Sequence, residues 1–346
     1  MRLPSSTAAI IASTIITFLS TSSAEPTSSS PSNPTKRGLV FVPDTRWPSD
    51  DQTWTQPGSD LTWYYNYEWE PSTAFASSPS QEDFEFVPML WGPPDNSNSD
   101  SDDDAPFRQS IESQLDAGRA IKHVLAFNEP DGPAAYGGSN VDPATAARVW
   151  VANIEPLAQR GVKLGLPACT GGWGGIPWLQ QFLGNCSELV SSGGDDDDEK
   201  EGGKRNCTYD FVNIHWYGNF EGLASHLGSY SAAFPNVTQW VTEYGYADQD
   251  LATTQAFFNQ SAEYLDRLDS VSRYSYFGAF RSEASNVGPN GAMLSDDGQL
   301  TDVGSWYLGG SATGVDPQSA GMRRGVPATG LVAVVAVLAG VVVLLW

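Results

Sequence analysis

Short apolar stretches recur at intervals along the middle of the chain. Each is four to eight residues long and rich in aromatic or β-branched side chains, a pattern typical of buried strands. Apolar residues at helical spacing lie between some of them, at residues 107–120, 143–160 and 251–268. Asp142 before Pro143 predicts a helix N-cap. The eight strand-like stretches cover residues 38–43, 63–67, 84–91, 123–127, 163–168, 211–216, 239–244 and 273–280.

Strands that alternate with helices favour βα units and a parallel sheet. Eight of them within residues 38–307 predict a single α/β domain of the (β/α)8, or TIM, barrel type. The main alternative is a doubly wound open sheet, which usually carries a glycine-rich phosphate turn after its first strand. Here the first stretch runs into Val42-Pro43-Asp44-Thr45 instead, so the barrel is favoured.

The composition excludes two classes of protein. The 346 residues include 12 Trp, 13 Tyr and 15 Phe, which a disordered chain would not carry. The net charge is −23 and no basic patch is present, so a nucleic-acid partner held by phosphate contacts is not expected. Two acidic runs, residues 95–104 and 195–201, supply −10 of that charge. We expect both to be solvated loops, because neither has the spacing of a calcium loop.

The first 24 residues have the features of a secretory signal peptide. Arg2 provides a positive charge, residues 8–19 are mostly apolar, and Ser22-Ser23-Ala24 resembles a small-residue cleavage site. The alternative is a core helix. Residues 25–37 are rich in Ser, Pro and Thr, which predicts a linker.

The last 16 residues, 331–346, are uncharged. They are fewer than the roughly 20 residues of a membrane-spanning helix, and no positive residues follow them, as the cytoplasmic end of a span would require. Small residues lie upstream at Ser319-Ala320-Gly321, before a nine-residue spacer. This pattern predicts a GPI-anchor signal, with a linker over 308–321, attachment at Ser319 and removal of 322–346. The alternatives are attachment near residues 309–312 and a single membrane span.

The cysteines and sequons fit a secreted chain. Cys186 and Cys207 flank the second acidic run, so a disulfide between them would close that loop. Cys169 then has no partner, and we expect it to be buried rather than nucleophilic. N-glycosylation is predicted at Asn185, Asn206, Asn236 and Asn259. Together with the two ends of the chain, these features predict a glycoprotein anchored by GPI at the plasma membrane or cell wall.

Two glutamates follow predicted strands at the end of a barrel where chemistry is found. The fourth stretch runs into Asn128-Glu129-Pro130, and the seventh ends in Thr242-Glu243-Tyr244. A Glu at the end of an apolar strand costs free energy unless its charge is paired or serves a function. Glycoside cleavage needs two carboxylates. We therefore predict Glu129 and Glu243 as catalytic residues and Asn128 as a partner for a sugar hydroxyl. For either Glu alone, a surface or salt-bridged position is the simpler explanation.

Other residues near strand ends are candidates for binding sugar. Indole faces stack on the apolar faces of sugars. Four tryptophans lie at or after strand ends, namely Trp69, Trp91, Trp173 and Trp216, and we expect about half of these four to be core residues. Flanking glycines favour exposure of Trp173. His215 or Tyr217 could donate to the nucleophile, with core packing as the alternative. The three histidines lack metal-ligand spacing, so no metal or other cofactor is expected. The candidates are Asn66, Trp69, Trp91, Trp173, His215, Trp216, Tyr217 and Tyr244.

These motifs in combination resemble fungal glycoside hydrolase family 128, a clan A family related to alkali-sensitive-linkage-type wall proteins. The matching segments are Lys36-Arg37-Gly38-Leu39, Phe127-Asn128-Glu129-Pro130-Asp131, His215-Trp216-Tyr217-Gly218 and Thr242-Glu243-Tyr244-Gly245. The resemblance implies a (β/α)8 β-1,3-glucanase with a retaining mechanism, in which Glu129 is the general acid/base and Glu243 the nucleophile. Many clan A enzymes also place an Arg from the second strand near the nucleophile, but residues 63–69 contain none.

The sequence thus predicts a monomeric β-1,3-glucan hydrolase at a cell surface. One alternative is a surface β-glucan-binding protein that keeps the barrel without activity, although a binder has no reason to retain both Glu129 and Glu243. Another is a clan A hydrolase of a different β-linked glycan, such as mannan or β-1,4-glucan.

Overall fold

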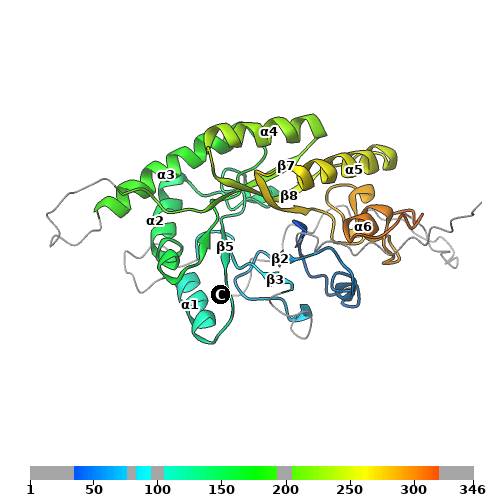
Figure 1. Cartoon of the computed structure of the whole chain (residues 1–346), viewed down its shortest axis with the longest axis horizontal. Coiled ribbons are helices and arrows are strands. Elements are labelled where there is room, and N and C mark those ends of the chain that lie inside the picture. The colour runs from blue at the N-terminus through cyan, green and yellow to red at the C-terminus, as the bar shows by residue number, and fades with distance from the viewer. Residues whose placement is uncertain (1–34, 76–82, 95–104, 193–204, 319–346) are drawn as a thin grey trace, which may run out of the picture. The chain divides into compact units, whose positions relative to one another are not determined.

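The computed structural model describes residues 35–75, 83–94, 105–192 and 205–318. In this part, strands and helices follow one another along the chain (Figure 1). The strands are β1 (Gly38–Val40), β2 (Trp63–Tyr65), β3 (Glu85–Phe86), β4 (Met89–Leu90), β5 (His123–Ala126), β6 (Lys163–Leu164), β7 (Phe211–Tyr217), β8 (Thr238–Gly245) and β9 (Val271–Tyr276). The α-helices are α1 (Pro106–Asp116), α2 (Pro143–Asn153), α3 (Gly175–Ser192), α4 (Phe220–Ala233), α5 (Leu251–Arg267) and α6 (Asp302–Tyr307).

The strands pair in parallel and form three sheets, ordered β1-β2-β3, β4-β5-β6 and β7-β8-β9. Isolated parallel bridges join Gly165 to Phe211 and Arg37 to Tyr274, beside the junctions of neighbouring sheets. The predicted α/β fold with parallel strands is confirmed. The predicted barrel of eight strands needs correction, because the described strands do not form one closed ladder.

Prolines account for two of the interruptions in the ladder. Pro88 divides the predicted strand 84–91, so that β3 pairs with β2 whereas β4 pairs with β5. In the predicted strand 163–168, only the first two residues form β6, and isolated bridges at Gly165 and Ala168 lie on either side of Pro167. Proline has no N–H to give to a ladder, which explains the break between β3 and β4 and the break between these two bridges.

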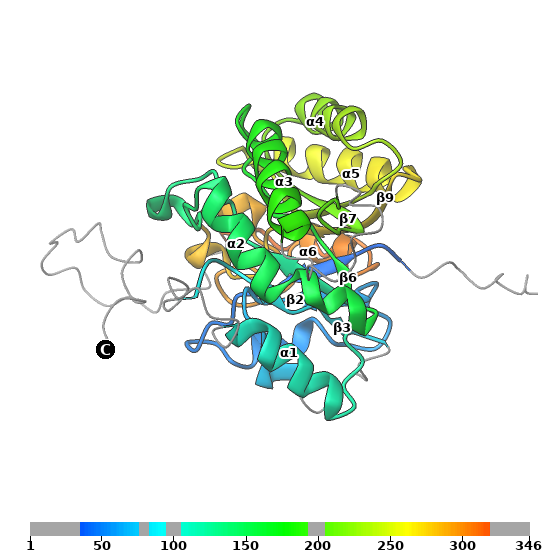
Figure 2. The same ribbon diagram turned by 90° about the vertical axis from the view of Figure 1, so that its left-hand side faces the viewer.

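Helices cover the strands from outside. Figures 1 and 2 both show α4 and α1 on opposite sides of the strands, with α3 and α5 on the same side as α4. Sequence patterns did not predict α3 and α4. Gly175 begins α3, and Gly222 and Gly228 lie within α4, where glycine lowers helix propensity. Among the helices of the described residues, none is long and apolar enough to cross a membrane.

The start of α2 is capped as predicted. The Asp142 carboxylate accepts from the backbone N–H groups of Ala144 (3.1 Å) and Thr145 (3.0 Å). The helix ends earlier than predicted, at Asn153, and a 3-10 helix (Glu155–Arg160) continues the chain. Pro156 explains the change, because proline disfavours α-helical backbone in the residue before it.

Successive side chains along each strand point to opposite faces, and this alternation divides the core into two layers. In the inner layer, side chains from different strands contact each other, and burying each of them fully stabilises the fold by roughly 1.5–3 kcal/mol. This inner cluster contains Val40, Trp63, Tyr65, Val87, Met89, Leu125, Phe211 and Trp240. A second, larger cluster includes alternate strand residues such as Tyr64 together with helical residues such as Ile111 and Leu179.

Charged residues lie within the strands near their amino ends. Glu85, which is 4% exposed, lies 2.7 Å from Nδ1 of His123 and accepts a 2.7 Å hydrogen bond from Arg273. The Arg273 guanidinium also lies 4.4 Å from the centre of the Trp240 ring. Burial alone would raise the pKa of Glu85, but the hydrogen bond with His123 and the charge of Arg273 outweigh it and hold the pKa below its usual value. This pairing is a structural feature of the core.

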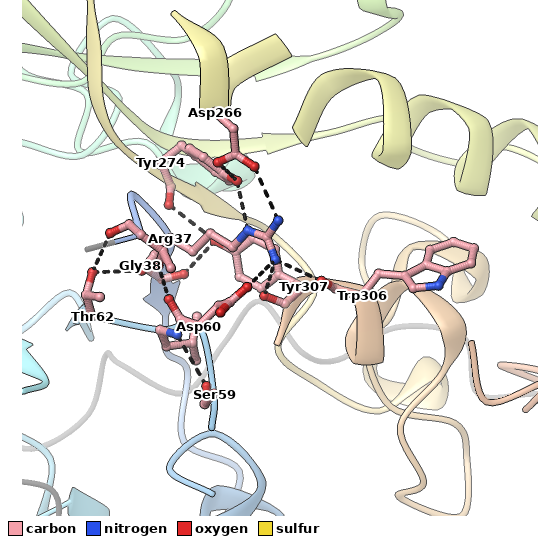
Figure 3. A network of polar contacts seen from close by, with 11 residues as sticks. Arg37, Gly38, Ser59, Asp60, Thr62, Asp266, Tyr274, Trp306 and Tyr307 are labelled. Carbon is pink, nitrogen blue, oxygen red and sulfur yellow. Dashed lines mark hydrogen bonds and ion pairs between the residues drawn. The ribbon is translucent and has the colours of Figure 1, made fainter. Parts of the chain in front are cut away.

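Arg37 joins the beginning of the fold to its last elements (Figure 3). Its Nε donates to the Tyr274 hydroxyl (2.9 Å), and its Nη1 donates to the Asp60 carboxylate (3.0 Å). The same Nη1 also donates to the carbonyl oxygens of Trp306 (2.8 Å) and Tyr307 (3.1 Å). Arg37 belongs to the predicted linker 25–37 but is therefore part of the folded unit.

Cys186 and Cys207 form a disulfide with their Cα atoms 5.5 Å apart, and Cys169 is buried. Of the predicted glycosylation sites, Asn206, Asn236 and Asn259 are exposed and Asn185 is half-buried. The predicted signal peptide, both acidic runs, Ser319 and the predicted GPI signal lie outside the described residues.

Candidate active site

Glu129 lies just beyond the carboxyl end of β5, in unusual backbone geometry. Phe127 (φ 37°) and Glu129 (φ 42°) both have positive φ, which residues other than glycine rarely adopt. Backbone hydrogen bonds hold them there: the Phe127 N–H donates to Leu90 and the Glu129 N–H donates to Ala168, each at 2.7 Å. Backbone of this kind is common at functional sites, where the surrounding structure fixes a side chain in position.

Glu243 lies in β8 directly opposite His215 of β7. The two strands pair Ile214 with Val241 and then His215 with Glu243, so that Thr242 is an extra residue on β8. Such a β-bulge changes the direction in which the following side chain points. Here it brings a carboxylate and an imidazole together at the carboxyl end of the sheet.

His215 lies between the two glutamates. Its Nδ1 is 3.0 Å from Oε1 of Glu129, and its Nε2 is 3.6 Å from Oε1 of Glu243. Burial alone would lower the pKa of His215, but the charges of Glu243 and Glu129 outweigh it and raise the pKa. A protonated imidazole offsets the repulsion between the carboxylates. With this charge between them, one oxygen of Glu129 lies within 4.8 Å of one oxygen of Glu243.

Tyrosine hydroxyls fix the orientation of Glu243. Tyr67 donates to its Oε1 and Tyr217 to its Oε2, each at 2.7 Å, and Tyr65 is 3.4 Å from Oε1. Burial, followed by the charge of Glu243, raises the pKa of all three hydroxyls well above the usual value. They remain protonated, and so they act as donors in charge-assisted hydrogen bonds to both carboxylate oxygens.

Tyr67 was not among the residues predicted from sequence. It comes from the 63–69 segment, in which the clan A pattern would place an Arg, and it supplies a donor to the same carboxylate. The signal in the sequence was the alternation Trp63, Tyr65, Tyr67, which puts three aromatic residues on one face of the strand and its extension. The positive φ of Tyr67 (63°), just past the end of β2, is not visible in that pattern.

The two glutamates open into a cleft of about 460 Å³ with aromatic walls. Trp91 and Tyr136 expose 39% and 85% of their surface, and both contribute to its lining. Asn128 also lines the cleft, and its Nδ2 donates to the Gly137 carbonyl (2.9 Å). The lining consists of Val42, Tyr67, Trp91, Asn128, Glu129, Tyr136, Gly137, Tyr217, Glu243, Ala247, Phe277, Asn286 and Val287.

Three predicted sugar-binding residues lie away from this cleft. Tyr244 is fully buried in the core, because the alternation that directs Glu243 inward directs its neighbour toward the helices. Asn66 donates to the Glu70 carbonyl within its own loop (3.1 Å). Trp69 packs against the core, with its ring centre 6.0 Å from that of Phe107.

Two further predicted residues, Trp173 and Trp216, line a separate pocket of about 330 Å³. Within the described ranges, two groups of side chains have atoms close enough to share a metal ion. One consists of Glu129, His215 and Glu243. The other includes Cys186 and Cys207, whose sulfur atoms are joined in the disulfide.

Two carboxylates with oxygens less than 5 Å apart lie in an aromatic-lined cleft at the carboxyl ends of parallel strands, an arrangement typical of glycoside hydrolases. Comparison with known families agrees with this class. The family described as "Glycosyl hydrolase catalytic core" matches residues 38–307, and the chain belongs to that family. The resemblance to glycoside hydrolase family 128 is confirmed.

The chain is 31% identical over 282 residues to alkali-sensitive linkage protein 1 of Schizosaccharomyces pombe. The match covers 79% of this chain but only 44% of that relative. A curdlan-specific family 128 exo-β-1,3-glucanase from Blastomyces gilchristii shares 27% identity, with a TM-score of 0.57 over 80% of this chain and 99% of that one. A family 128 oligosaccharide-binding protein from Trichoderma gamsii has the same fold, with 21% identity and a TM-score of 0.55 over 80% and 93% of the two chains.

Proposed function

We propose that this protein is a retaining glycoside hydrolase that cleaves β-1,3-glucan. The observation that carries the proposal is the spacing of Glu129 and Glu243, with oxygens within 4.8 Å of each other. The carboxyl groups are about 5–5.5 Å apart in retaining enzymes and about 6.5–9.5 Å apart in inverting enzymes, which need room for a water molecule. The substrate class follows from the similar β-1,3-glucanase.

In the first step of this mechanism, an oxygen of Glu243 attacks the anomeric carbon of the sugar. Protonated Glu129 gives its proton to the glycosidic oxygen as the bond from that oxygen to the anomeric carbon breaks. The leaving chain departs with a new hydroxyl, and the remaining sugar is joined to Glu243 as an ester. The hydroxyls of Tyr67 and Tyr217 orient the attacking carboxylate.

In the second step, the ionised Glu129 takes a proton from water, and the water oxygen attacks the same anomeric carbon. The ester bond to Glu243 breaks, and the sugar leaves with its original anomeric configuration. His215 contacts both glutamates, so its charge compensates whichever carboxylate is ionised in each half of the cycle.

Two isosteric variants test the proposal. Glu129→Gln and Glu243→Gln should each reduce the release of reducing sugar from laminarin, a soluble β-1,3-glucan, by at least about a thousandfold. Glu283→Gln, in a short 3-10 helix outside the cleft lining, serves as the matched control and should keep normal activity. Normal activity in either cleft variant would exclude the assigned roles.

A second candidate function is glucan binding without cleavage. The similar fold of an oligosaccharide-binding protein and the exposed aromatic residues Trp91 and Tyr136 support it. It predicts that the purified protein binds laminarin without releasing reducing sugar. The same assay on mannan and β-1,4-glucan separates cleavage of β-1,3-glucan from cleavage of another β-linked glycan.

We also propose that the protein is a GPI-anchored glycoprotein of a cell surface, as its terminal sequences and sequons suggest. Release of the protein from intact cells by a phosphatidylinositol-specific phospholipase C tests the anchor. Replacement of Ser319 alone with a bulky residue tests the attachment site.

A further inference from the structure

Trp173 projects from the loop between β6 and α3 with its side chain in solvent. It is fully exposed (101%), although the indole is the largest apolar side chain. Gly171, Gly172 and Gly174 surround it in sequence and offer no side chains to cover the ring. A soluble fold gains nothing by leaving such a ring in water, so a ligand that covers the ring would explain its position.

The 330 Å³ pocket beside Trp173 has a rigid aromatic wall. Trp216 points away from the cleft, because it follows His215 on β7 and side chains alternate along a strand. Its Nε1 donates to the Asn219 carbonyl (3.0 Å), and its ring lies 5.1 Å from that of His226. A Cβ atom at Gly222 would lie 2.1 Å from the Trp216 ring, so this helix position accommodates only glycine while the ring stays in place.

The polar groups of the pocket are neutral. Nε2 of His226 is buried and has no hydrogen-bond partner among the described residues. Burial lowers the pKa of His226, which keeps the imidazole uncharged near neutral pH. Ser225 and Ser229 add hydroxyl groups one helical turn apart, and the lining contributed by the described part of the chain contains no Asp, Glu, Lys or Arg. A neutral ligand rich in hydroxyl groups fits this set, whereas a phosphate or a charged peptide does not.

The pocket is separate from the cleft but belongs to the same edge of the fold. Among the described residues, none lines both. The loop that carries Trp173 is tied to the loop of Glu129, because the backbone N–H and hydroxyl of Thr170 each donate to the Asp131 carboxylate at 2.8 Å. A polysaccharide long enough to pass beyond the cleft could therefore contact both sites.

We propose that Trp173, Trp216 and His226 form a second carbohydrate-binding site, which takes pyranose units of a β-glucan chain outside the catalytic cleft. The indole of Trp173 covers one sugar face, and His226 with the serine hydroxyls accepts and donates hydrogen bonds to sugar hydroxyls. The choice of glucan rests on the proposed function, whereas the choice of a neutral saccharide rests on the pocket itself.

Affinity electrophoresis in gels containing laminarin tests the site in the Glu243→Gln background, which removes cleavage from the measurement. Adding Trp173→Ala should weaken retention by about fivefold, the loss expected for one stacked aromatic contact. Trp173→Phe keeps an aromatic face and should restore most of the retention. Since Trp173 is exposed, its replacement is not expected to unfold the protein.

Kinetics of the otherwise unchanged enzyme then distinguish the two sites. Trp173→Ala should raise KM for laminarin while leaving kcat/KM for laminaritetraose, a short oligosaccharide, unchanged. Unaltered retention of Trp173→Ala in laminarin gels would overturn the site. An equal loss on laminaritetraose would overturn its separation from the cleft. Full hydrolysis by Glu243→Gln would refute the proposed catalytic roles instead. Retention would then be measured in a shorter electrophoresis run, before the laminarin in the gel is cleaved.

Discussion

The Tyr67 hydroxyl donates a 2.7 Å hydrogen bond to Oε1 of Glu243 from a loop 176 positions earlier in the chain. Tyr217 makes the matching bond to Oε2, so each oxygen of the proposed nucleophile has its own donor. These two bonds hold the carboxylate in one plane before substrate arrives. Fixed orientation of this kind reduces the cost of reaching the transition state.

Removing either hydroxyl should therefore reduce kcat more than it changes KM. Tyr67→Phe and Tyr217→Phe each lose a hydrogen bond to a charged group, and such bonds contribute about 1.5–3 kcal/mol. We expect kcat on laminarin to fall about ten- to a hundredfold in each variant. Tyr65→Phe is the comparison, because its hydroxyl is 3.4 Å from Glu243 and has a second acceptor, the Thr242 carbonyl at 3.0 Å. An equal or larger loss in Tyr65→Phe would contradict this order.

His215 should stabilise the fold most at acid pH. Its pKa is raised in the folded protein, so its contribution is complete below the unfolded value of about 6.5 and is lost as pH rises through the folded value. Melting temperatures of the native protein and His215→Gln should differ more at pH 5 than at pH 9. His226→Gln is the matched control. Since burial lowers the pKa of His226, its pH dependence should have the opposite sign. A constant difference between native protein and His215→Gln over this range would refute the charged His215.

Arg37 should contribute to stability rather than to catalysis. Replacing it with Met leaves the half-buried Asp60 and two backbone carbonyls without their donor, and losing a hydrogen bond to a charged group costs about 1.5–3 kcal/mol. We expect the melting temperature to fall by roughly 3–12 °C. Arg46→Met removes an exposed arginine (51%) paired with Asp44 and should change the melting temperature by no more than about 2 °C. Similar melting temperatures for the two variants would contradict the role of Arg37.

Glu85 should protect the fold at neutral pH and lose that effect in acid. Its pKa is lowered in the folded protein, so its contribution is present above the unfolded value of about 4.3 and is lost as pH falls through the folded value. Glu85→Gln should therefore be less stable than the native protein at pH 7, and the difference should narrow toward pH 3. Because Glu85 does not line the cleft, kcat at 25 °C should not change. Urea unfolding at several pH values measures the difference in stability between the two proteins. A difference that widens in acid would contradict the pairing of Glu85 with His123 and Arg273.

Local sequence patterns predicted the parts of the fold that depend on local chemistry. Asp142 with Pro143 predicted the start of α2, and the apolar stretches lie within or around the observed strands. The patterns could not predict where ladders stop, since that depends on which neighbour each strand meets. Pro88 shows this, because the two halves of one apolar stretch pair with different strands.

The same limit applies to the site. Strand ends identified Glu129, His215, Tyr217 and Glu243, which the fold brings together. Tyr67 was missed because its reach to Glu243 depends on a positive φ beyond β2. Tyr244 was included because adjacency in sequence does not tell which face of the strand is buried.

Trapping the glycosyl-enzyme tests the central claim most directly. The protein is incubated with a 2-deoxy-2-fluoro-β-laminaribiosyl donor that carries a good leaving group. The fluorine slows hydrolysis of the ester intermediate, and the leaving group lets the intermediate form. Intact mass and peptide mapping then locate the sugar. We predict one added disaccharide on the peptide that contains Glu243, and none in Glu243→Gln. Hydrolysis of laminarin that proceeds with no adduct, or with an adduct on another residue, would contradict the assignment of Glu243 as the nucleophile.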